Sequence, residues 1–140
     1  MEPQKIISIV ISMFNEKDNI QKLISEIEEV IIVVPYRCEL IFTDDGSTDG
    51  TAEAIRNSGH KIKGNPTVRL ISLSRNFGHE AAMLAGIDHA TGDAVICMDA
   101  DLQHPPEMIP EMVAAYECGK DIVLMTRKKN LGSSAGAGWF

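Results

Sequence analysis

The sequence predicts an α/β fold: a mostly parallel sheet with helices packed on both of its faces. Short apolar runs of strand length alternate with segments in which apolar residues recur every three or four positions, which is the spacing of one helix face. The runs lack polar alternation, as expected for strands that are covered on both sides. Five strands alternating with four helices indicate right-handed crossovers between parallel strands.

The first strand is predicted over 5–13, where the run KIISIVISM is apolar and rich in β-branched residues. The helix after it is amphipathic, with apolar positions at Ile20, Leu23, Ile24, Ile27, Ile31 and Val34. Asn15 and Asp18 are candidate caps at the start of this helix. Pro35 closes it, because proline cannot continue a helix.

The later elements follow the same alternation. Strands are predicted over 39–43, 68–73, 94–98 and 121–125, and helices over 51–57, 79–90 and 106–118. The helix 79–90 is rich in alanine, whose small side chain lets a helix pack closely on a sheet. We therefore expect a partial domain over 1–126 and a tail over 127–140, basic and then rich in Gly, Ser and Ala, that leads into a C-terminal portion.

Composition narrows the possible functions. With 13 Lys and Arg against 20 Asp and Glu, the 140-residue chain carries a formal charge of −7, which argues against nucleic acid or an anionic membrane surface as the main partner. No apolar run approaches the length of about 20 residues that a membrane span needs, and residues 1–5 do not resemble a signal peptide. The odd number of cysteines (Cys38, Cys97 and Cys118) indicates buried thiols in a reducing, cytoplasmic compartment.

Polar and aromatic residues follow the ends of four predicted strands. They are Phe14, Asn15 and Glu16 after the first, Asp44 and Asp45 after the second, Arg75 and Asn76 after the third, and Asp99 and Asp101 after the fourth. In an open parallel sheet, ligands bind outside the carboxyl ends of the strands. Because acidic groups gathered at one edge repel one another, a cation or a set of hydrogen-bond donors is expected among them.

Asp99 and Asp101 are the strongest candidates for metal ligands. A spacing of two along an extended chain puts both carboxylates on one side of the backbone. Mg²⁺ and Mn²⁺ use one or two carboxylates together with phosphate oxygens and water, and Gln103 could offer a third protein oxygen. Alternatively, Asp101 or His104 caps the helix that begins at Pro106.

For the other residues at this edge, the sequence is compatible with two roles each. Asp44 and Asp45 are either turn residues or contacts to a base or a ribose hydroxyl. Arg75 could bind phosphate or form a surface ion pair. His79 could act as an acid or base, or as a cap or surface residue.

Four motifs occur in a family-specific order and spacing: ISIVISMFNE at 7–16, DDGSTDGT at 44–51, SRNFG at 74–78 before the alanine-rich helix, and DADLQHPPE at 99–107. With them, the sequence resembles the family 2 glycosyltransferases, and more narrowly the polyprenol-phosphate sugar transferases similar to dolichol-phosphate mannose synthase. The resemblance covers nearly all of this chain, but only the nucleotide-binding portion of such an enzyme.

The resemblance implies the Rossmann-like GT-A fold and a nucleotide-diphospho-sugar donor bound with Mg²⁺ or Mn²⁺. Asp99 and Asp101 would be the catalytic residues and, with Gln103, the metal ligands. The implied donor-binding residues are Ser12, Phe14, Asn15, Glu16, Asp44, Asp45, Arg75, Asp99 and Ala100. Within this set, Asp45 would bond the base and Phe14 would lie beside its ring. Ser12 stands where the family usually has proline, and Phe14 where it usually has tyrosine.

The implied reaction transfers the sugar, with inversion, to a lipid phosphate such as a polyprenyl phosphate. The acceptor site and any membrane helices are expected beyond Phe140, which would place the whole protein at the cytoplasmic face of a membrane. This portion alone would bind nucleotide weakly, and could pair with a second copy through apolar surface that a cut domain exposes. Two other hypotheses remain: a Mg²⁺-dependent receiver or phosphatase domain, although the strand 121–125 has no lysine at its tip, and a non-catalytic nucleotide-binding module.

Overall fold

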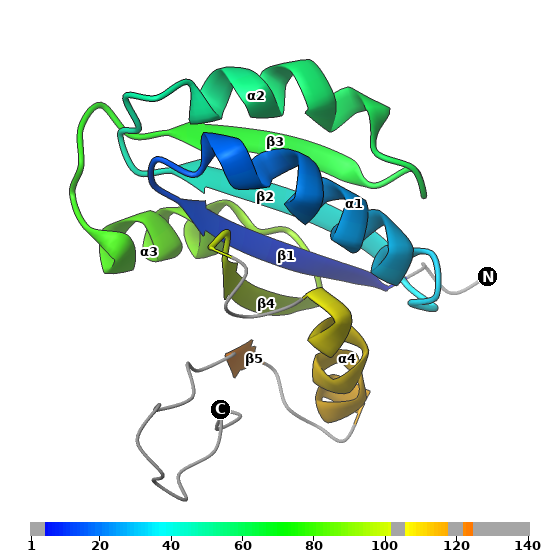
Figure 1. Ribbon diagram of the computed structural model, residues 1–140. Helices are drawn as coiled ribbons and strands as arrows, with labels where there is room; N and C mark the ends of the chain where they lie inside the picture. The colour runs from blue at the N-terminus through cyan, green and yellow to red at the C-terminus, as the bar shows by residue number, and fades with distance from the viewer. Residues whose placement is uncertain (1–4, 102–105, 118–121, 125–140) are drawn as a thin grey trace, which may run out of the picture.

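The computed structural model describes residues 5–101, 106–117 and 122–124, which form a parallel sheet with helices on both faces (Figure 1). Within this part, the strands lie in the order β3-β2-β1-β4-β5, and every pairing is parallel. Their bounds are β1 Ile6–Met13, β2 Arg37–Asp44, β3 Thr67–Ser72, β4 Ala94–Asp99 and β5 Ile122–Leu124. The helices are α1 Ile20–Ile31, α2 Thr51–Ser58, α3 His79–His89 and α4 Ile109–Glu117, with 3₁₀ turns η1 Lys17–Asn19, η2 Gly59–Lys61 and η3 Pro106–Met108. The predicted fold class is confirmed.

Some sequence-based expectations fall on residues that the structure does not describe. They concern Gln103, His104, Cys118, the tail 127–140 and the domain boundary after 126, all of which lie outside the described residues. These expectations stay predictions.

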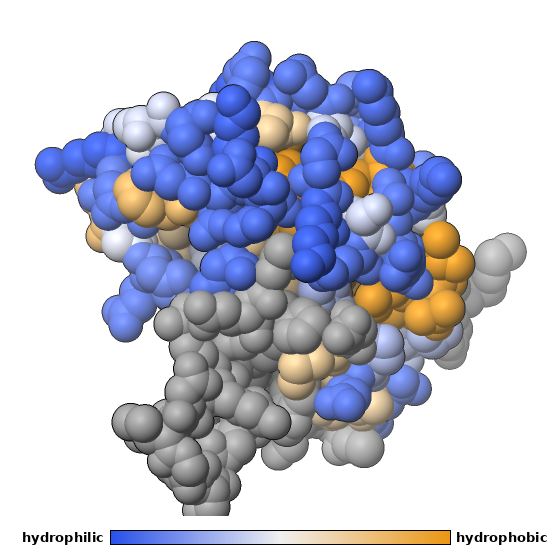
Figure 2. Space-filling model, in the orientation of Figure 1, coloured by the Kyte–Doolittle hydropathy of each residue, from blue (hydrophilic) through white to orange (hydrophobic). Residues whose placement is uncertain are grey.

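Helices α1, α2 and α4 cover one face of the sheet. Ile9 and Ile11 of β1 are fully buried there, in one apolar cluster with Leu23 and Ile27 of α1 and Met112 of α4. Full burial of such a side chain contributes about 1.5–3 kcal/mol. The outward surfaces of α1 and α2 are hydrophilic (Figure 2), as the amphipathic pattern of α1 predicts.

Helix α3 packs against the opposite face, over β1 and β2. A smaller core joins it to the central strands and consists of Val10, Ile41 and Cys97, with Met83 and Ile87 of α3 against them. Gly86 sets the distance, because a Cβ at this position would lie 2.3 Å from Val10 Cγ1 and 2.8 Å from Thr43 Oγ1. Close packing of this helix is therefore confirmed, and a glycine as well as the alanines makes it possible.

The start of α1 differs from the prediction. A 3₁₀ turn, Lys17–Asn19, precedes the helix, and Asn19 occupies the N-cap position without a side-chain capping bond. Asn15 and Asp18 therefore do not cap α1. Asn15 has a positive φ of 51° and lies in the loop before the turn, where its side chain binds a different backbone amide, described below.

The end of α1 also differs. The helix stops at Ile31 rather than at Val34, and the amide of Val33 donates to the carbonyl of Val30 at 3.1 Å in a tightened last turn. Because the residue before a proline is disfavoured in helical geometry, Val34 leaves the helix ahead of Pro35. Val34 is still buried, so the apolar spacing correctly marked a core position beyond the helix.

Within the described ranges, no helix combines the length and the apolar character needed to cross a bilayer. Cys38 and Cys97 are free and buried, as predicted. Burial raises the pKa of the Cys38 thiol to about 11, and burial together with the charge of Asp99 raises that of Cys97 to about 12. Both thiols are therefore neutral near pH 7 and behave as small hydrophobic side chains.

Candidate functional site

The carboxyl ends of the central strands bring the predicted site residues to one edge of the sheet. In the strand register, Ser12 lies opposite Asp99, and Met13 lies opposite Asp44. The chain continues the ladder just past the strands, where the amide of Asp45 donates to the carbonyl of Met13 at 2.9 Å. Residues that follow β1, β2 and β4 therefore lie side by side.

Asp99 is the last residue of β4, and its side chain is 18% exposed. Two groups contact the same oxygen, Oδ1: the hydroxyl of Ser12 donates to it at 2.7 Å, and Nε2 of His79, in the first turn of α3, lies against it. Within the described part of the chain, Oδ2 of Asp99 has no hydrogen-bond partner. Among the described residues, the hydrogen bonds to this carboxylate therefore converge on one of its two oxygens.

The residues after Asp99 were predicted to complete a metal site. Ala100 is buried, and its amide donates to the carbonyl of Ser12 at 3.0 Å. Asp101 is partly exposed, and Gln103 lies outside the described residues. Among residues 5–101, 106–117 and 122–124, no three His, Cys, Asp or Glu side chains group closely enough to hold a metal ion by themselves. A cation bound here would take further oxygens from a phosphate or water, as Mg²⁺ and Mn²⁺ commonly do.

The loop after β1 is tied to the loop after β2 by four hydrogen bonds. The amide of Asn15 donates to Ser47 Oγ at 2.8 Å, and the amide of Thr48 donates to Asn15 Oδ1 at 2.9 Å. Two more link the backbone of the first loop to side chains of the second, Glu16 N to Thr51 Oγ1 at 3.0 Å and Lys17 N to Asp49 Oδ2 at 3.1 Å. The two loops therefore form one connected wall of the site.

This connection explains the polar residues of the motif at 44–51. Burial by itself raises the pKa of the Asp49 carboxyl, but hydrogen bonds from Thr51 and from the amide of Lys17 outweigh it and lower that pKa below its ordinary value. Sequence reasoning did not assign roles to Ser47, Asp49 or Thr51. Their occurrence in a turn-like sequence with a hydroxyl or carboxylate at nearly every position was the available signal.

Asp44 and Asp45 are both buried, with 4% and 3% of their surfaces exposed. Asp44 Oδ1 accepts hydrogen bonds from the amide and the hydroxyl of Ser47, which closes the turn after β2. Asp45 accepts from the amide of Phe77 at 2.8 Å and from the amide of Gly78 at 3.1 Å. In this conformation both carboxylates bind the protein's own loops.

Two aromatic rings are exposed at this edge. Phe14, directly after β1, is 44% exposed, and Phe77, in the loop before α3, is 50% exposed. The guanidinium of Arg75 lies over the ring of Phe77, 4.6 Å from its centroid. The site therefore offers flat apolar surface and a positive charge beside its carboxylates.

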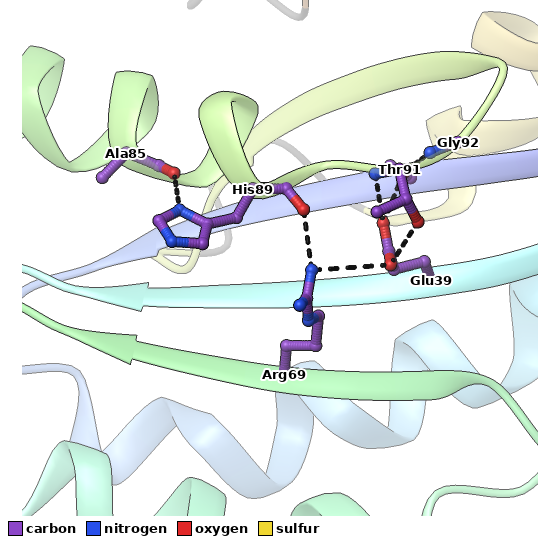
Figure 3. A network of polar contacts seen from close by, with 7 residues as sticks. Glu39, Arg69, Ala85, His89, Thr91 and Gly92 are labelled. Carbon is purple, nitrogen blue, oxygen red and sulfur yellow. Dashed lines mark hydrogen bonds and ion pairs between the residues drawn. The ribbon is translucent and has the colours of Figure 1, made fainter.

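A second polar network lies at the opposite end of the strands (Figure 3). Glu39, near the start of β2, is 5% exposed and accepts three hydrogen bonds, from Ser8 Oγ at 2.8 Å, Thr91 N at 2.9 Å and Thr91 Oγ1 at 2.8 Å. Arg69 lies 4.0 Å from Glu39 Oε2 and donates to the carbonyl of His89 at 2.7 Å. Burial alone raises the pKa of Glu39, but these donors and the arginine outweigh it, so the pKa lies below its ordinary value. The network holds the end of α3 and the turn into β4 against the sheet.

Comparison with known proteins decides the family. The family model described as "Glycosyl transferase family 2" matches residues 8–139, almost the whole chain. The chain belongs to this family. The match supports the glycosyltransferase hypothesis over a receiver or phosphatase domain.

Two curated relatives of this family 2 chain have informative names. The chain is 40% identical over 137 residues to the undecaprenyl-phosphate 4-deoxy-4-formamido-L-arabinose transferase of Pseudomonas savastanoi pv. phaseolicola, covering 98% of the chain and 40% of that protein. It is 43% identical over 121 residues to the bactoprenol glucosyl transferase of Shigella phage SfV, covering 86% of the chain and 38% of that protein. The chain therefore spans about two fifths of the length of these relatives.

The fold of this chain also matches a solved structure. Glucosyl-3-phosphoglycerate synthase from Mycobacterium tuberculosis, solved in complex with Mn²⁺, UDP and glucosyl-3-phosphoglycerate, matches with a TM-score of 0.63 and 26% identity, over 83% of this chain and 41% of that one. The fold of the family 2 chain is the GT-A fold of glycosyltransferases, as the resemblance implied.

Proposed function

We propose that this chain is the donor-binding part of an inverting glycosyltransferase that moves a sugar from a nucleotide-diphospho-sugar to a polyprenyl phosphate. The observation that carries the proposal is the state of Asp99, whose Oδ1 is held by Ser12 and His79 while Oδ2 has no partner within the described residues. A carboxylate held in this way at the carboxyl edge of a parallel sheet fits a ligand-binding role. The names of the relatives supply the class of acceptor.

The donor set at this edge fits Mg²⁺ or Mn²⁺. Oδ2 of Asp99 and the carboxylate of Asp101 are hard oxygen ligands of the kind these ions take, and Gln103, two residues further along the sequence, would add an amide oxygen. When bound, the ion would neutralise the negative charge that develops on the departing diphosphate. The solved complex with Mn²⁺ and UDP, from a protein of the same fold, supports this choice of cofactor.

The chain's own residues would bind and orient the nucleotide. The exposed ring of Phe14 offers a surface for the base, and the hydrogen bonds among Asn15, Ser47 and Thr48 keep the neighbouring loops in place. Arg75 would balance phosphate charge in a chain whose formal charge is −7. A direct bond from Asp45 to the base would compete with the bonds that this carboxylate accepts from Phe77 and Gly78.

The acceptor phosphate would be bound mainly by residues that correspond to the part of the relatives' length that this chain does not span. A lipid phosphate oxygen is already anionic at pH 7, so the attack on the sugar carbon does not require a strong general base. Direct attack opposite the leaving diphosphate inverts the configuration at that carbon. A lipid acceptor of this kind would bring the whole protein to a membrane, and we infer that it acts at the cytoplasmic face.

Calorimetric titration of the chain with UDP-glucose and GDP-mannose, with and without Mn²⁺, tests the proposal. We expect binding that requires Mn²⁺ and that Asp101→Ala abolishes. Asp88→Ala is the matched control, because Asp88 is an exposed carboxylate near the far end of α3. Metal-independent binding, or binding that survives Asp101→Ala, would contradict the proposed metal site.

A further inference from the structure

Strand β3 forms one edge of the sheet, beside α2 (Figure 1), and within the described residues it pairs only with β2. The amide of Leu73, directly after this strand, donates to the carbonyl of Asp44 at 2.9 Å. Because backbone groups alternate in direction along a strand, the amides and carbonyls of Val68, Leu70 and Ser72 point away from β2. An extended chain could pair with these outward groups as a further strand.

A cavity of about 370 Å³ lies beside this edge, between β3, α2 and η2. Val68 and Leu70 line it from the strand, with Ile55 of α2 and Pro66 of the loop before β3. The residues that offer the outward backbone groups are therefore also the ones whose side chains line the cavity. A free strand edge next to a pocket for alternate side chains is the arrangement that binds extended peptides by strand addition.

The segment around β3 is the basic part of an acidic chain. All 20 Asp and Glu residues lie outside residues 54–79, a stretch that contains Arg56, Lys61, Lys63, Arg69 and Arg75. Lys61 and Lys63 precede β3, are exposed and, unlike Arg56 and Arg69, form no ion pair with a described carboxylate. Pairing of β3 with a second copy of itself would bring two basic stretches together, whereas an acidic strand would be attracted.

We propose that β3 and the adjacent cavity form a docking site for an extended acidic segment of another protein. The segment would pair with the outward backbone groups of Val68, Leu70 and Ser72 and place an apolar side chain in the cavity. Its carboxylates would lie near Lys61 and Lys63. The inference does not depend on nucleotide binding, because it concerns the edge strand and not the carboxylates after β1, β2 and β4.

Synthetic peptides as long as β3, six residues, test this site without altering the protein. The probe alternates glutamate and leucine, and its charge control alternates lysine and leucine. Calorimetric titration should show binding of the acidic peptide that weakens as salt is added, and binding of the basic peptide that is weaker by about tenfold or more.

N-methylation of the acidic peptide tests the backbone pairing at unchanged charge. One version is methylated on the glutamate amides and the other on the leucine amides. Only one set of amides points toward β3, so we expect one version to bind about tenfold or more weakly and the other to bind like the parent peptide. Loss on the glutamate amides would indicate a parallel added strand, and loss on the leucine amides an antiparallel one.

Variants of the chain test the same contacts from the other side. Ser72→Pro removes one outward amide and keeps the ladder to β2, whereas Ser72→Ala keeps both. We expect about fivefold weaker peptide binding in Ser72→Pro and no change in Ser72→Ala. Lys61→Gln combined with Lys63→Gln should also weaken binding, and Lys22→Gln on the exposed face of α1 is its charge control.

Hydrogen exchange of the wild type locates the bound peptide. The amides of Val68 and Leu70 should exchange quickly in the free chain and slowly in the complex. The amides of Arg69 and Ile71 point toward β2 and should be protected in both states, which makes them controls within the same strand.

Several results would overturn the inference. They are no binding of the acidic peptide, equal binding of the acidic and basic peptides, full binding of both methylated versions, and protection confined to amides outside β3. Concentration-dependent dimerisation that protects Val68 and Leu70 would assign the edge to a second copy. Binding to phosphatidylglycerol vesicles without binding to the acidic peptide would assign the basic stretch to a lipid surface.

Discussion

Glu39 and Asp99 are carboxylates at opposite ends of one parallel sheet, and each accepts a hydrogen bond from a serine of β1. Ser8 donates to Glu39 at the amino end, and Ser12 donates to Asp99 at the carboxyl end. Both oxygens of Glu39 have hydrogen-bond partners, whereas among the described residues only Oδ1 of Asp99 accepts a hydrogen bond. A buried carboxylate whose acceptor sites are filled stabilises the fold, and one with an oxygen left over is available to a ligand. Residue type alone does not distinguish the two.

Among the substitutions that test this difference, replacement of Asp99 should have the largest effect on ligand binding. We expect Asp99→Asn to abolish Mn²⁺-dependent nucleotide binding and to lower any sugar-transfer rate by about 10²–10³. The free energy of unfolding should change little, because Asn keeps an oxygen that accepts from Ser12. Calorimetry and urea denaturation of the same samples measure the two effects. A variant that binds nucleotide normally would remove Asp99 from the site.

Substitution of Glu39 should have the opposite pattern. Glu39→Ala leaves the hydroxyls of Ser8 and Thr91 and the amide of Thr91 without their acceptor, so we expect a loss of about 2–3 kcal/mol in the free energy of unfolding. Nucleotide affinity of the folded protein should stay the same. Glu53→Ala, which removes only an exposed ion pair on α2, should cost less than about 0.5 kcal/mol by the same urea measurement. Equal losses in the two variants would show that the network adds no stability.

The two serines of β1 offer a finer test. Ser8→Ala should lower the free energy of unfolding by about 1–2 kcal/mol, since the amide of Gly92 also donates to Ser8 Oγ, at 2.8 Å. Ser12→Ala should cost less stability and weaken Mn²⁺ binding by about tenfold, because Ser12 orients Asp99. Urea denaturation and Mn²⁺ titration distinguish the two. If both variants lose only stability, Ser12 does not orient Asp99 for Mn²⁺ binding.

The pH dependence of stability should give the smallest effect. The folded-state pKa of Glu39 lies below its ordinary value of 4.5, so its contribution is complete above that value and is lost as the pH falls through the lower, folded pKa. The difference in the free energy of unfolding between the wild type and Glu39→Gln should therefore shrink below about pH 4.5. Urea denaturation between pH 3 and pH 7 measures it. A difference that stays constant would mean that ionisation of Glu39 does not stabilise the fold.

The sheet and the edge that carries the site could be predicted because both follow from local patterns. Apolar runs such as 5–13 identify buried strands, and parallel strands bring their carboxyl ends to one edge, so Asp44 and Asp99 had to lie near each other. The partners of Glu39 could not be predicted, because Ser8 and Thr91 lie 31 and 52 residues away along the chain. Such contacts depend on the strand register and not on local sequence.

The contacts of individual site residues also could not be predicted from the sequence. Ser12 stands where the family usually has proline, and the sequence did not indicate that its hydroxyl donates to Asp99. The residue Asn15 was expected to cap α1, but its positive φ turns it toward Thr48 instead. The ligand assignments of all the predicted site residues, Asp99 and Asp101 included, stay predictions. Backbone conformation and the approach of separate loops decide such roles, and a single sequence does not contain them.

Cys38 and Cys97 can report local opening on the two sides of the sheet separately. Cys38 belongs to the core under α1, and Cys97 belongs to the smaller core under α3. Since both thiols are shielded and protonated near pH 7, an alkylating reagent modifies each one only after local opening exposes it. Mass spectrometry of timed alkylation would therefore measure the rate of local opening on each side of the sheet separately. The experiment uses the wild-type chain without any engineered label.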